Sequence, residues 1–286
     1  MPAVSVIIPT YNRAHCLETA IASVLAQDFG DFELIVSDDG STDRTEELVS
    51  GIADSRIAYL KNQANSGAAA ARNLAIERSI APLIAFLDSD DIWLPGKLDT
   101  HLRWMQQQPT VLASFTDYQL FRESNGKTSV RSPHAERNDW AWDLLLYCRA
   151  AAGSTLLARR EAFEIHGFFD MTLTRFEDWD WLLRLAFENH LAKAPLIGSQ
   201  VTRSGHQGWP DLAPHYDTMI NRWKRSTEQK YGQEGLKRLR AGASIQQATS
   251  AYAAGDRFSA LPHLIAAFAK QPNATFRFCA SRLRNL

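Results

Sequence analysis

The chain of 286 residues has the composition of an ordinary globular protein, with 45% hydrophobic and 22% charged residues. It holds no apolar stretch long enough to cross a bilayer, and its N-terminus lacks the basic region of a signal peptide. The three cysteines are far apart and form no CxxC pair, so we expect neither a disulfide framework nor a zinc site. These features favour a cytoplasmic protein with reduced thiols.

Charge is distributed unevenly along the chain. Residues 215–286 contain 12 Lys and Arg against 4 Asp and Glu, a net charge of +8, whereas residues 1–214 carry 19 basic and 28 acidic residues, a net of −9. A basic appendage suits an anionic membrane surface, and its Trp223, Phe276 and Phe278 lie among Arg and Lys as in an interfacial helix. The alternative is that these charges only solvate helix faces. No recognised nucleic-acid module is present, so nucleic acid is not an expected partner.

The first ninety residues alternate between strand and helix patterns. Short apolar runs predict four strands, at 4–8, 32–37, 56–60 and 83–87. Helical spacing, capping residues and strong helix formers predict three helices, at 13–27, from about residue 41, and at 66–79. Strands and helices that alternate in this way form right-handed crossovers, so we expect a mainly parallel sheet covered by helices.

The rest of the chain mixes both patterns. Strands are predicted at 111–121 and 154–158, with a polar loop at 122–137. Helices are predicted from Pro95 to about Gln108, at 139–149, 159–167 and 176–190, and throughout the chain from Pro214 onward.

Polar and acidic residues follow three of the predicted strands. Ligands of a doubly wound sheet bind beyond the carboxyl ends of its strands, so these residues are expected to converge on one edge. They are Pro9, Thr10 and Tyr11 after the first strand, Asp38 and Asp39 after the second, and Asp88, Ser89, Asp90 and Asp91 after the fourth. The first turn is not GxGxxG, so a dinucleotide site loses its main support.

The DxD sequence Asp88-Ser89-Asp90 offers hard oxygen ligands at the exit of a buried strand. Carboxylates at this spacing repel each other, so we expect a positive group among them. Such ligands suit Mg²⁺ or Mn²⁺, which would bridge to substrate phosphates and offset charge on a diphosphate leaving group. Tyr11 is then suited to stack on a base, and Asp38 to accept a hydrogen bond from a ring N–H. A DxD also occurs in surface turns, where it only caps a strand.

Six motifs occur in the order found in family 2 glycosyltransferases, which they resemble: VSVIIPTYNR, LIVSDDGSTDRT, NSGAAAARNLAI, IAFLDSDDIWLPGKL, GFFD and FEDWDWLLRLA. The resemblance runs from about residue 4 to about residue 206. It implies an α/β fold of the GT-A type and a single displacement that inverts the anomeric centre of a nucleotide-diphosphate sugar.

The resemblance also implies roles for individual residues. Tyr11 and Asp38 would contact the base, Arg72 would lie near the nucleotide, Asp88 would face the ribose or the metal, and Asp90 would bind the metal. His206 resembles a family position near the diphosphate and joins the expected metal ligands, although a lone histidine is often structural. The expected nucleotide site thus comprises Pro9, Thr10, Tyr11, Asp38, Asp39, Arg72, Asp88 and Ser89.

An acceptor hydroxyl that attacks the sugar needs a base on the face opposite the diphosphate. The segment FEDWDW supplies carboxylates at Glu177, Asp178 and Asp180. The Glu-Asp pair of the family maps onto Glu177 and Asp178, and we expect Asp178 to be the base, with Asp180 as its competitor. Acidic residues in a first helical turn also stabilise the helix through its dipole, which is the alternative interpretation.

These features predict a metal-assisted inverting glycosyltransferase that moves a sugar, most readily from UDP, to a saccharide or lipid-linked acceptor in polysaccharide biosynthesis of the cell envelope. We expect a GT-A domain at 1–213, with a nucleotide-binding part at 1–110 and an acceptor-binding part at 111–213. A basic helical extension is expected at 214–286, in peripheral contact with an anionic membrane.

Two other functions remain open. A phosphohydrolase of the haloacid dehalogenase kind also places DxD after an apolar strand, but it has Thr or Val two residues after the second Asp, where this chain has Ile92. A catalytically silent nucleotide-sugar binding module would keep the pocket alone. Retention of both the DxD and the pair Glu177-Asp178 argues against such a module.

Overall fold

The computed structural model describes residues 1–203, 213–253 and 255–283. The chain folds into two compact units. The first comprises Met1–His134 and Ala150–Arg203, and the second comprises Ala135–Arg149 and the described part of Ser204–Leu286. The boundary between a catalytic domain and an extension at residue 213 stays a prediction.

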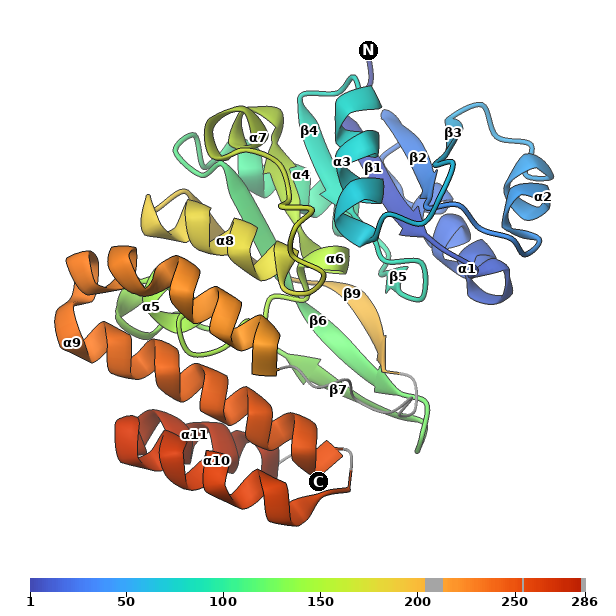
Figure 1. Cartoon of the computed structure of the whole chain (residues 1–286). Helices are drawn as coiled ribbons and strands as arrows, with labels where there is room; N and C mark the ends of the chain where they lie inside the picture. The colour runs from blue at the N-terminus through green and yellow to red at the C-terminus, as the bar shows by residue number, and fades with distance from the viewer. Residues whose placement is uncertain (204–212, 254, 284–286) are drawn as a thin grey trace. The chain divides into compact units, whose positions relative to one another are not determined.

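The first unit begins with the four strands that the sequence predicts, and they are parallel, in the order β3-β2-β1-β4. They are β1 (Val4–Thr10), β2 (Phe32–Asp38), β3 (Ile57–Lys61) and β4 (Leu83–Phe86). The helices between them are α1 (Ala14–Leu25), α2 (Thr45–Ser50) and α3 (Ala68–Arg78), which Figure 1 shows beside the blue and cyan strands. The predicted parallel sheet with crossover helices is confirmed.

Beyond β4 the sheet becomes mixed, in the order β8-β6-β9-β5. Its strands are β5 (Ile92–Trp93), β6 (Ala113–Arg122), β7 (Lys127–Arg131), β8 (Leu157–Arg159) and β9 (Leu191–Arg203). The pairs β4–β8, β8–β6 and β5–β9 are antiparallel, β6 and β9 are parallel, and β7 pairs with β6 as a hairpin.

Two predictions for this part are wrong, and one strand was missed. The expected loop at 122–137 contains β7, because the Asn125-Gly126 turn closes a hairpin whose strand is polar. The expected strand at 154–158 begins instead as a helical turn, α6 (Ala152–Thr155), followed by β8. The long strand β9 was not predicted.

The core of the first unit lies between the parallel strands and helices α1 and α4 (Lys97–Gln106). The apolar residues of β1 and β2 are almost fully buried, which explains their short apolar runs. Each such Val, Leu or Ile side chain contributes about 1.5–3 kcal/mol when fully buried. A second apolar group joins β4, α7 (Arg160–His166) and α8 (Glu177–Phe187), where Phe163 stacks on Trp181 with ring centroids 4.5 Å apart.

The second unit is helical, so the predicted C-terminal helical extension is confirmed. Its elements are η1 (Glu136–Asn138), α5 (Trp140–Leu144), α9 (Ala213–Ala253), α10 (Arg257–Lys270) and α11 (Pro272–Leu283). The predicted helix at 139–149 is shorter than expected and ends at Leu144. Buried Arg238 joins its elements, donating from Nε to the Trp142 carbonyl at 2.7 Å and pairing with Asp143 at 3.1 Å.

Two aromatic residues expected at a membrane interface are not exposed. Trp223 and Phe278 are buried, so their predicted role is wrong, whereas Phe276 is exposed. An amphipathic helix buries its apolar face against its neighbours. Sequence alone does not tell whether a given aromatic residue packs on that face against the protein or faces outward. No helix in the described ranges combines the length and apolar character that a membrane span requires.

Candidate active site

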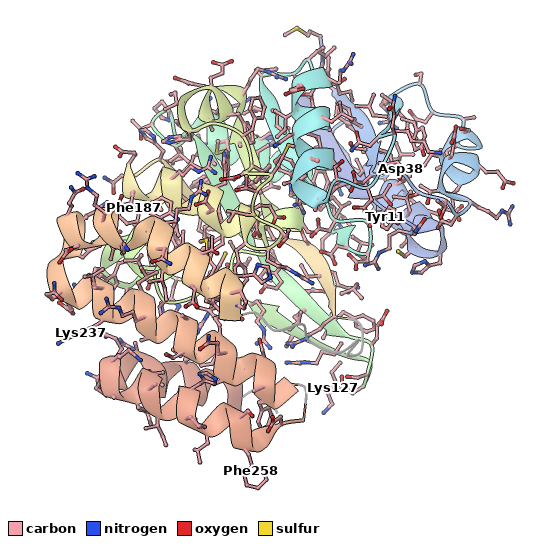
Figure 2. All side chains as sticks on the ribbon, in the orientation of Figure 1. Tyr11, Asp38, Lys127, Phe187, Lys237 and Phe258 are labelled. Atoms are coloured by element: carbon pink, nitrogen blue, oxygen red, sulfur yellow. The ribbon has the colours of Figure 1, made fainter. Side chains whose placement is uncertain are left out.

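The carboxyl ends of β1 and β2 bring two predicted nucleotide contacts to one edge of the sheet. Thr10 and Asp38 pair across the two strands at their last residues, and Tyr11 follows directly. Figure 2 labels Tyr11 and Asp38 at this edge. Tyr11 is 42% exposed and available to stack on a ring, whereas Asp38 is buried.

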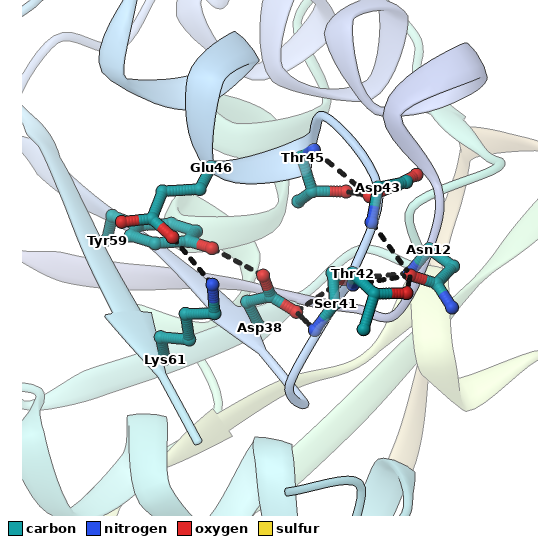
Figure 3. A network of polar contacts seen from close by, with 9 residues as sticks. All are labelled: Asn12, Asp38, Ser41, Thr42, Asp43, Thr45, Glu46, Tyr59 and Lys61. Atoms are coloured by element: carbon teal, nitrogen blue, oxygen red, sulfur yellow. Dashed lines mark hydrogen bonds and ion pairs between the residues drawn. The ribbon is translucent and has the colours of Figure 1, made fainter. Parts of the chain in front are cut away.

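Hydrogen bonds join the loops that follow β1 and β2 (Figure 3). Asn12 accepts bonds from the backbone N–H of Thr42 at 2.8 Å and of Asp43 at 3.3 Å, and its own N–H donates to Ser41 Oγ at 2.8 Å. Its φ of 53° lies in the left-handed region, which Asn tolerates better than most residues. The network therefore fixes the backbone that follows Tyr11.

Asp38 is held by three hydrogen bonds. Oδ1 accepts from the backbone N–H of Ser41 at 2.8 Å and from its hydroxyl at 2.6 Å, and Oδ2 accepts from the hydroxyl of Tyr59 (Figure 3). Burial and the bond to Asp38 raise the pKa of Tyr59, so its hydroxyl stays a donor. A carboxylate has about four acceptor positions, so these three bonds leave one of them unused. Sequence reasoning missed both Tyr59 and Ser41.

Asp39 holds the loop that precedes α3. Its oxygens accept from the side chain of Asn62 at 2.8 Å and from the backbone N–H groups of Ser66 at 3.0 Å and Gly67 at 2.6 Å. Gly67 has a φ of 95°, a conformation that glycine adopts without strain. Asp39 therefore sets the position at which α3 begins.

Arg72 on α3 bridges two acidic residues for which the sequence predicted different roles. Its Nη2 lies 2.8 Å from Asp88 Oδ1, and its Nη1 lies 2.8 Å from Glu177 Oε1. The Arg72 side chain is only 8% exposed, so these pairs are shielded from solvent. A planar guanidinium can pair with two carboxylates at once, which an ammonium does less well. Arg72 therefore supplies one of the positive charges that we expected among the carboxylates of the DxD loop.

Asp178 follows Glu177 in the first turn of α8. Burial raises the pKa of Asp178 to about 6, the charge of Glu177 adds to the rise, and Arg72 opposes it. A pKa near the working pH suits a general base. Asp180, the competitor, is fully buried and forms an ion pair with Arg184 one turn later. This geometry favours Asp178 over Asp180.

The loop that leads to Glu177 is clamped to α3. The Asn73 side chain donates to the Phe169 carbonyl at 2.8 Å and accepts from the Phe169 N–H at 3.1 Å. Phe176, just before Glu177, has a φ of 69°. Such a conformation costs a non-glycine residue about 1–3 kcal/mol and is concentrated at functional sites.

Two residues that sequence reasoning missed, Gly153 and Ser154, support the DxD loop. Ser154 Oγ accepts from the Asp88 N–H at 3.1 Å and donates to Asp91 Oδ2, while Asp91 Oδ1 accepts from the Thr202 N–H at 2.7 Å. Burial raises the pKa of Asp91 to about 8, and the charge of Asp88 adds to the rise. A methyl group on Gly153 would lie 2.5 Å from Asp88 Cγ, so a side chain at this position would displace the Asp88 carboxylate.

Asp88 and Asp90 are the described candidates for binding a divalent cation. Both side chains are partly exposed, and Arg13 Nη1 lies 3.4 Å from Asp90 Oδ2. Across the part of the chain that the structure describes, no group of three His, Cys, Asp or Glu side chains is arranged to hold a metal. Two carboxylates fit a cation that takes one or two ligands from the protein and the others from a diphosphate.

The other predicted site residues divide into two groups. Pro9, Thr10 and Ser89 lie at the strand ends and are buried. His206, an expected metal ligand, falls outside the described residues.

Comparisons with known proteins identify relatives of this chain. The model of the family "Glycosyl transferase family 2" matches residues 5–165. The UDP-Glc:alpha-D-GlcNAc-diphosphoundecaprenol beta-1,3-glucosyltransferase WfaP of Escherichia coli is 36% identical over 159 residues, 56% of this chain and 62% of that protein. The putative colanic acid biosynthesis glycosyl transferase WcaA of Escherichia coli is 33% identical over 195 residues, 65% of this chain and 67% of that protein.

A third relative is the putative teichuronic acid biosynthesis glycosyltransferase TuaG of Bacillus subtilis. It is 42% identical over 124 residues, 43% of this chain and 49% of that protein. The chain therefore matches less than two thirds of the length of WfaP and about half the length of TuaG.

Solved structures with the same fold include two glycosyltransferases with bound nucleotide sugars. S. aureus TarS 1-349 in complex with UDP-GlcNAc has a TM-score of 0.68 at 18% identity, covering 100% of this chain and 92% of that chain. The mannosyltransferase PcManGT from Pyrobaculum calidifontis, in complex with GDP-Man and Mn²⁺, has a TM-score of 0.59 at 19% identity. The match covers 100% of this chain and 81% of that chain. The predicted GT-A type of fold is confirmed.

Proposed function

Because the chain belongs to glycosyl transferase family 2, we propose that it transfers a sugar from a nucleotide-diphosphate donor to a saccharide or lipid-linked acceptor by a single inverting displacement. The observation that carries the proposal is the Arg72 bridge. It joins the DxD loop through Asp88 to the candidate base helix through Glu177, at 2.8 Å on each side. A donor site and a base are thereby held together, as a displacement requires.

The donor is expected to bind at the edge formed by β1, β2 and β4. Tyr11 stacks on the base, and the remaining acceptor position of Asp38 receives a ring N–H, which suits the uracil of UDP. Asp90, with Asp88 beside it, would hold Mn²⁺ or Mg²⁺. That cation, when bound, offsets the charge that develops on the leaving diphosphate. Glu177 holds Arg72 in place, and Asp178 takes the proton of the attacking hydroxyl.

The acceptor is expected to be a lipid-linked saccharide of cell-envelope polysaccharide synthesis. The name of WfaP describes transfer to a diphosphoundecaprenol-linked sugar, and TuaG and WcaA are named for teichuronic and colanic acid biosynthesis. The two other functions that the sequence left open, a phosphohydrolase and a silent binding module, are not favoured by these relatives.

The experiment is a transfer assay with a panel of nucleotide sugars, Mn²⁺ and lipid-linked saccharide acceptors. Release of nucleoside diphosphate together with a glycosylated acceptor is the expected result. Asp178→Asn should lower the rate by about 10²–10⁴-fold, because it removes the base. Release of inorganic phosphate from a phosphate ester would instead favour the phosphohydrolase. Donor binding without turnover, under conditions in which the acceptors are used by a control enzyme, would favour the binding module.

We also propose that the helical second unit contacts an anionic membrane, where a lipid-linked acceptor would be. Phe258, Leu261 and Ile265 are exposed at helical spacing on α10, and Phe258 is 92% exposed. Figure 2 shows Phe258 projecting from α10. Residues 215–286 carry the net charge of +8, and each basic residue near an anionic leaflet contributes about 1 kcal/mol.

Co-sedimentation with anionic and neutral vesicles tests this contact. Binding should require anionic lipid, weaken with salt and fall in Phe258→Ser. Ile80→Ser, which removes an exposed apolar side chain from the first unit, is the matched control and should bind as wild type does. Wild-type protein that ignores anionic vesicles at low salt would disprove the contact.

A further inference from the structure

The two arginines that pair with the DxD carboxylates differ in how firmly they are held. Arg72 is 8% exposed and pairs with Asp88 and Glu177 at 2.8 Å each. Arg13 is 43% exposed, and its guanidinium pairs with Asp90 at the longer distance of 3.4 Å. Arg72 is therefore a fixed part of the site, whereas the Arg13 guanidinium can leave its partner at little cost.

The backbone of Arg13, in contrast to its side chain, is fixed. Arg13 precedes α1, and its carbonyl accepts from the N–H groups of Cys16 and Leu17 at 3.0 Å each. On its two sides, Asn12 belongs to the network of Figure 3, and the Ala14 N–H donates to Asp43 Oδ2 at 3.1 Å. A guanidinium on a flexible stem with a fixed origin can swing between partners within its reach.

Among the described residues, the Asp90 carboxylate has one basic side chain close to it. Arg13 is the sole Lys or Arg within 4.0 Å of its carboxylate among the described residues. The charges of Asp88 and Glu123 also act on Asp90, so the carboxylate lies in a negative field that Arg13 opposes. A divalent cation must therefore compete with Arg13 for Asp90.

We propose that Arg13 is a displaceable counter-ion, which occupies Asp90 while the donor site is empty, yields the carboxylate to a divalent cation, and pairs with the donor diphosphate when the donor binds. This inference rests on the proposed function, because it takes Asp90 as the metal ligand. A guanidinium pairs well with a diphosphate, to which it can donate two parallel hydrogen bonds. The exchange keeps Asp90 neutralised before the metal arrives and adds a positive charge to the leaving group afterwards.

The test measures two binding equilibria that involve no turnover, each with one ligand alone. With Mn²⁺ alone, Arg13→Gln should bind the cation about two- to fivefold more tightly than wild type, because the competing charge is gone. With UDP alone in EDTA, the same variant should bind UDP about five- to tenfold more weakly, because the diphosphate loses its partner. Tighter Mn²⁺ binding together with weaker UDP binding in the same variant would show that one side chain competes with the cation and also binds the diphosphate.

Controls separate this exchange from a general effect of charge. Arg103→Gln removes an equal charge from an exposed ion pair with Asp99 on α4 and should change neither equilibrium. Arg13→Lys should keep part of both effects. An Arg13→Gln variant that binds Mn²⁺ no more tightly than wild type, or UDP no more weakly, overturns the proposal.

Asp90→Asn distinguishes this failure from a failure of the proposed function. If Asp90→Asn binds Mn²⁺ as tightly as wild type, the metal assignment is wrong, and the role of Arg13 falls with it. If Asp90→Asn loses Mn²⁺ but Arg13→Gln gains nothing, the metal assignment stands and the counter-ion role alone is wrong.

Discussion

Arg72 and Glu177 are 105 residues apart in the chain, and their side chains form an ion pair of 2.8 Å. The same guanidinium binds Asp88 of the DxD loop, so the start of α8 and the exit of β4 are tied to one side chain of α3. A displacement at the sugar needs the leaving group and the base at a fixed separation. In the proposed function, the Arg72 bridge would hold the DxD loop and the start of α8 at that separation.

Gly153→Ala tests whether the position of Asp88 matters. The added methyl group would lie 2.5 Å from Asp88 Cγ and 2.6 Å from Oδ1, so the carboxylate must move, which disturbs its pair with Arg72. We expect at least a tenfold loss of transfer, because small displacements at a reacting centre cost up to about 10²-fold. Steady-state kinetics and a thermal melt measure the effect. Gly30→Ala, where no atom lies within 4 Å of the new methyl group, is the matched control and should retain full activity.

The raised pKa of Asp178 predicts where the transfer rate falls at low pH, that is, the acid limb of the pH–rate profile. With a pKa of about 6, Asp178 is mostly a carboxylate at pH 7 and mostly protonated at pH 5. The transfer rate should therefore fall about tenfold for each pH unit below 6. Glu177→Gln removes a neighbouring negative charge, so the pKa of Asp178 drops and the limb moves to lower pH. A limb that stays at the same pH in Glu177→Gln would show that another group titrates.

Buried Lys97 predicts a pH-dependent stability. Its ammonium nitrogen has no hydrogen-bond partner among the described residues and lies 3.6 Å from the Trp93 ring centre, and burial lowers the pKa of Lys97 from 10.5 to about 7. Between these two values the unfolded chain binds more protons, so this lysine makes wild-type stability rise with pH. The rise should be about 2–3 kcal/mol between pH 7 and pH 9.

Lys97→Met removes this dependence. Urea unfolding should show the variant to be more stable than wild type at pH 7, with a smaller gain at pH 9, because the neutral amine is then less costly to bury. Lys237→Met, at an exposed position of α9, should show no such difference. An equal gain for Lys97→Met at both pH values would contradict the account of Lys97.

The parts of the fold that the sequence predicted are those whose signal is local. The apolar runs at 4–8 and 32–37 become β1 and β2 because both faces of a parallel strand are buried. The strand β9 was missed because it pairs with β6 from 70 or more residues away, and its sequence is only partly apolar. The polar strand β7 was missed as well, although Asn125-Gly126 is a strong hairpin signal.

For the site, spacing along the strands predicted Asp38, Asp88 and Asp90 as site residues but did not predict the side chains that contact them. Tyr59 contacts Asp38 from 21 residues away, and Ser154 contacts Asp91 from 63 residues away. Neither Tyr59 nor Ser154 lies in a motif. Contacts of this kind depend on how loops from different strands fold back onto one edge, which no periodicity records. The positive charge predicted among the carboxylates is supplied in this structure by two arginines, Arg72 and Arg13.

The most direct test of the central claim is a calorimetric titration of UDP into wild type, Asp90→Asn and Asp178→Asn, with and without Mn²⁺. A donor site completed by a cation at Asp90 predicts that Mn²⁺ tightens UDP binding about tenfold or more in wild type and in Asp178→Asn. The same account predicts no tightening in Asp90→Asn. If Mn²⁺ strengthens UDP binding equally in Asp90→Asn and wild type, the claim that this carboxylate joins the metal to the donor is contradicted.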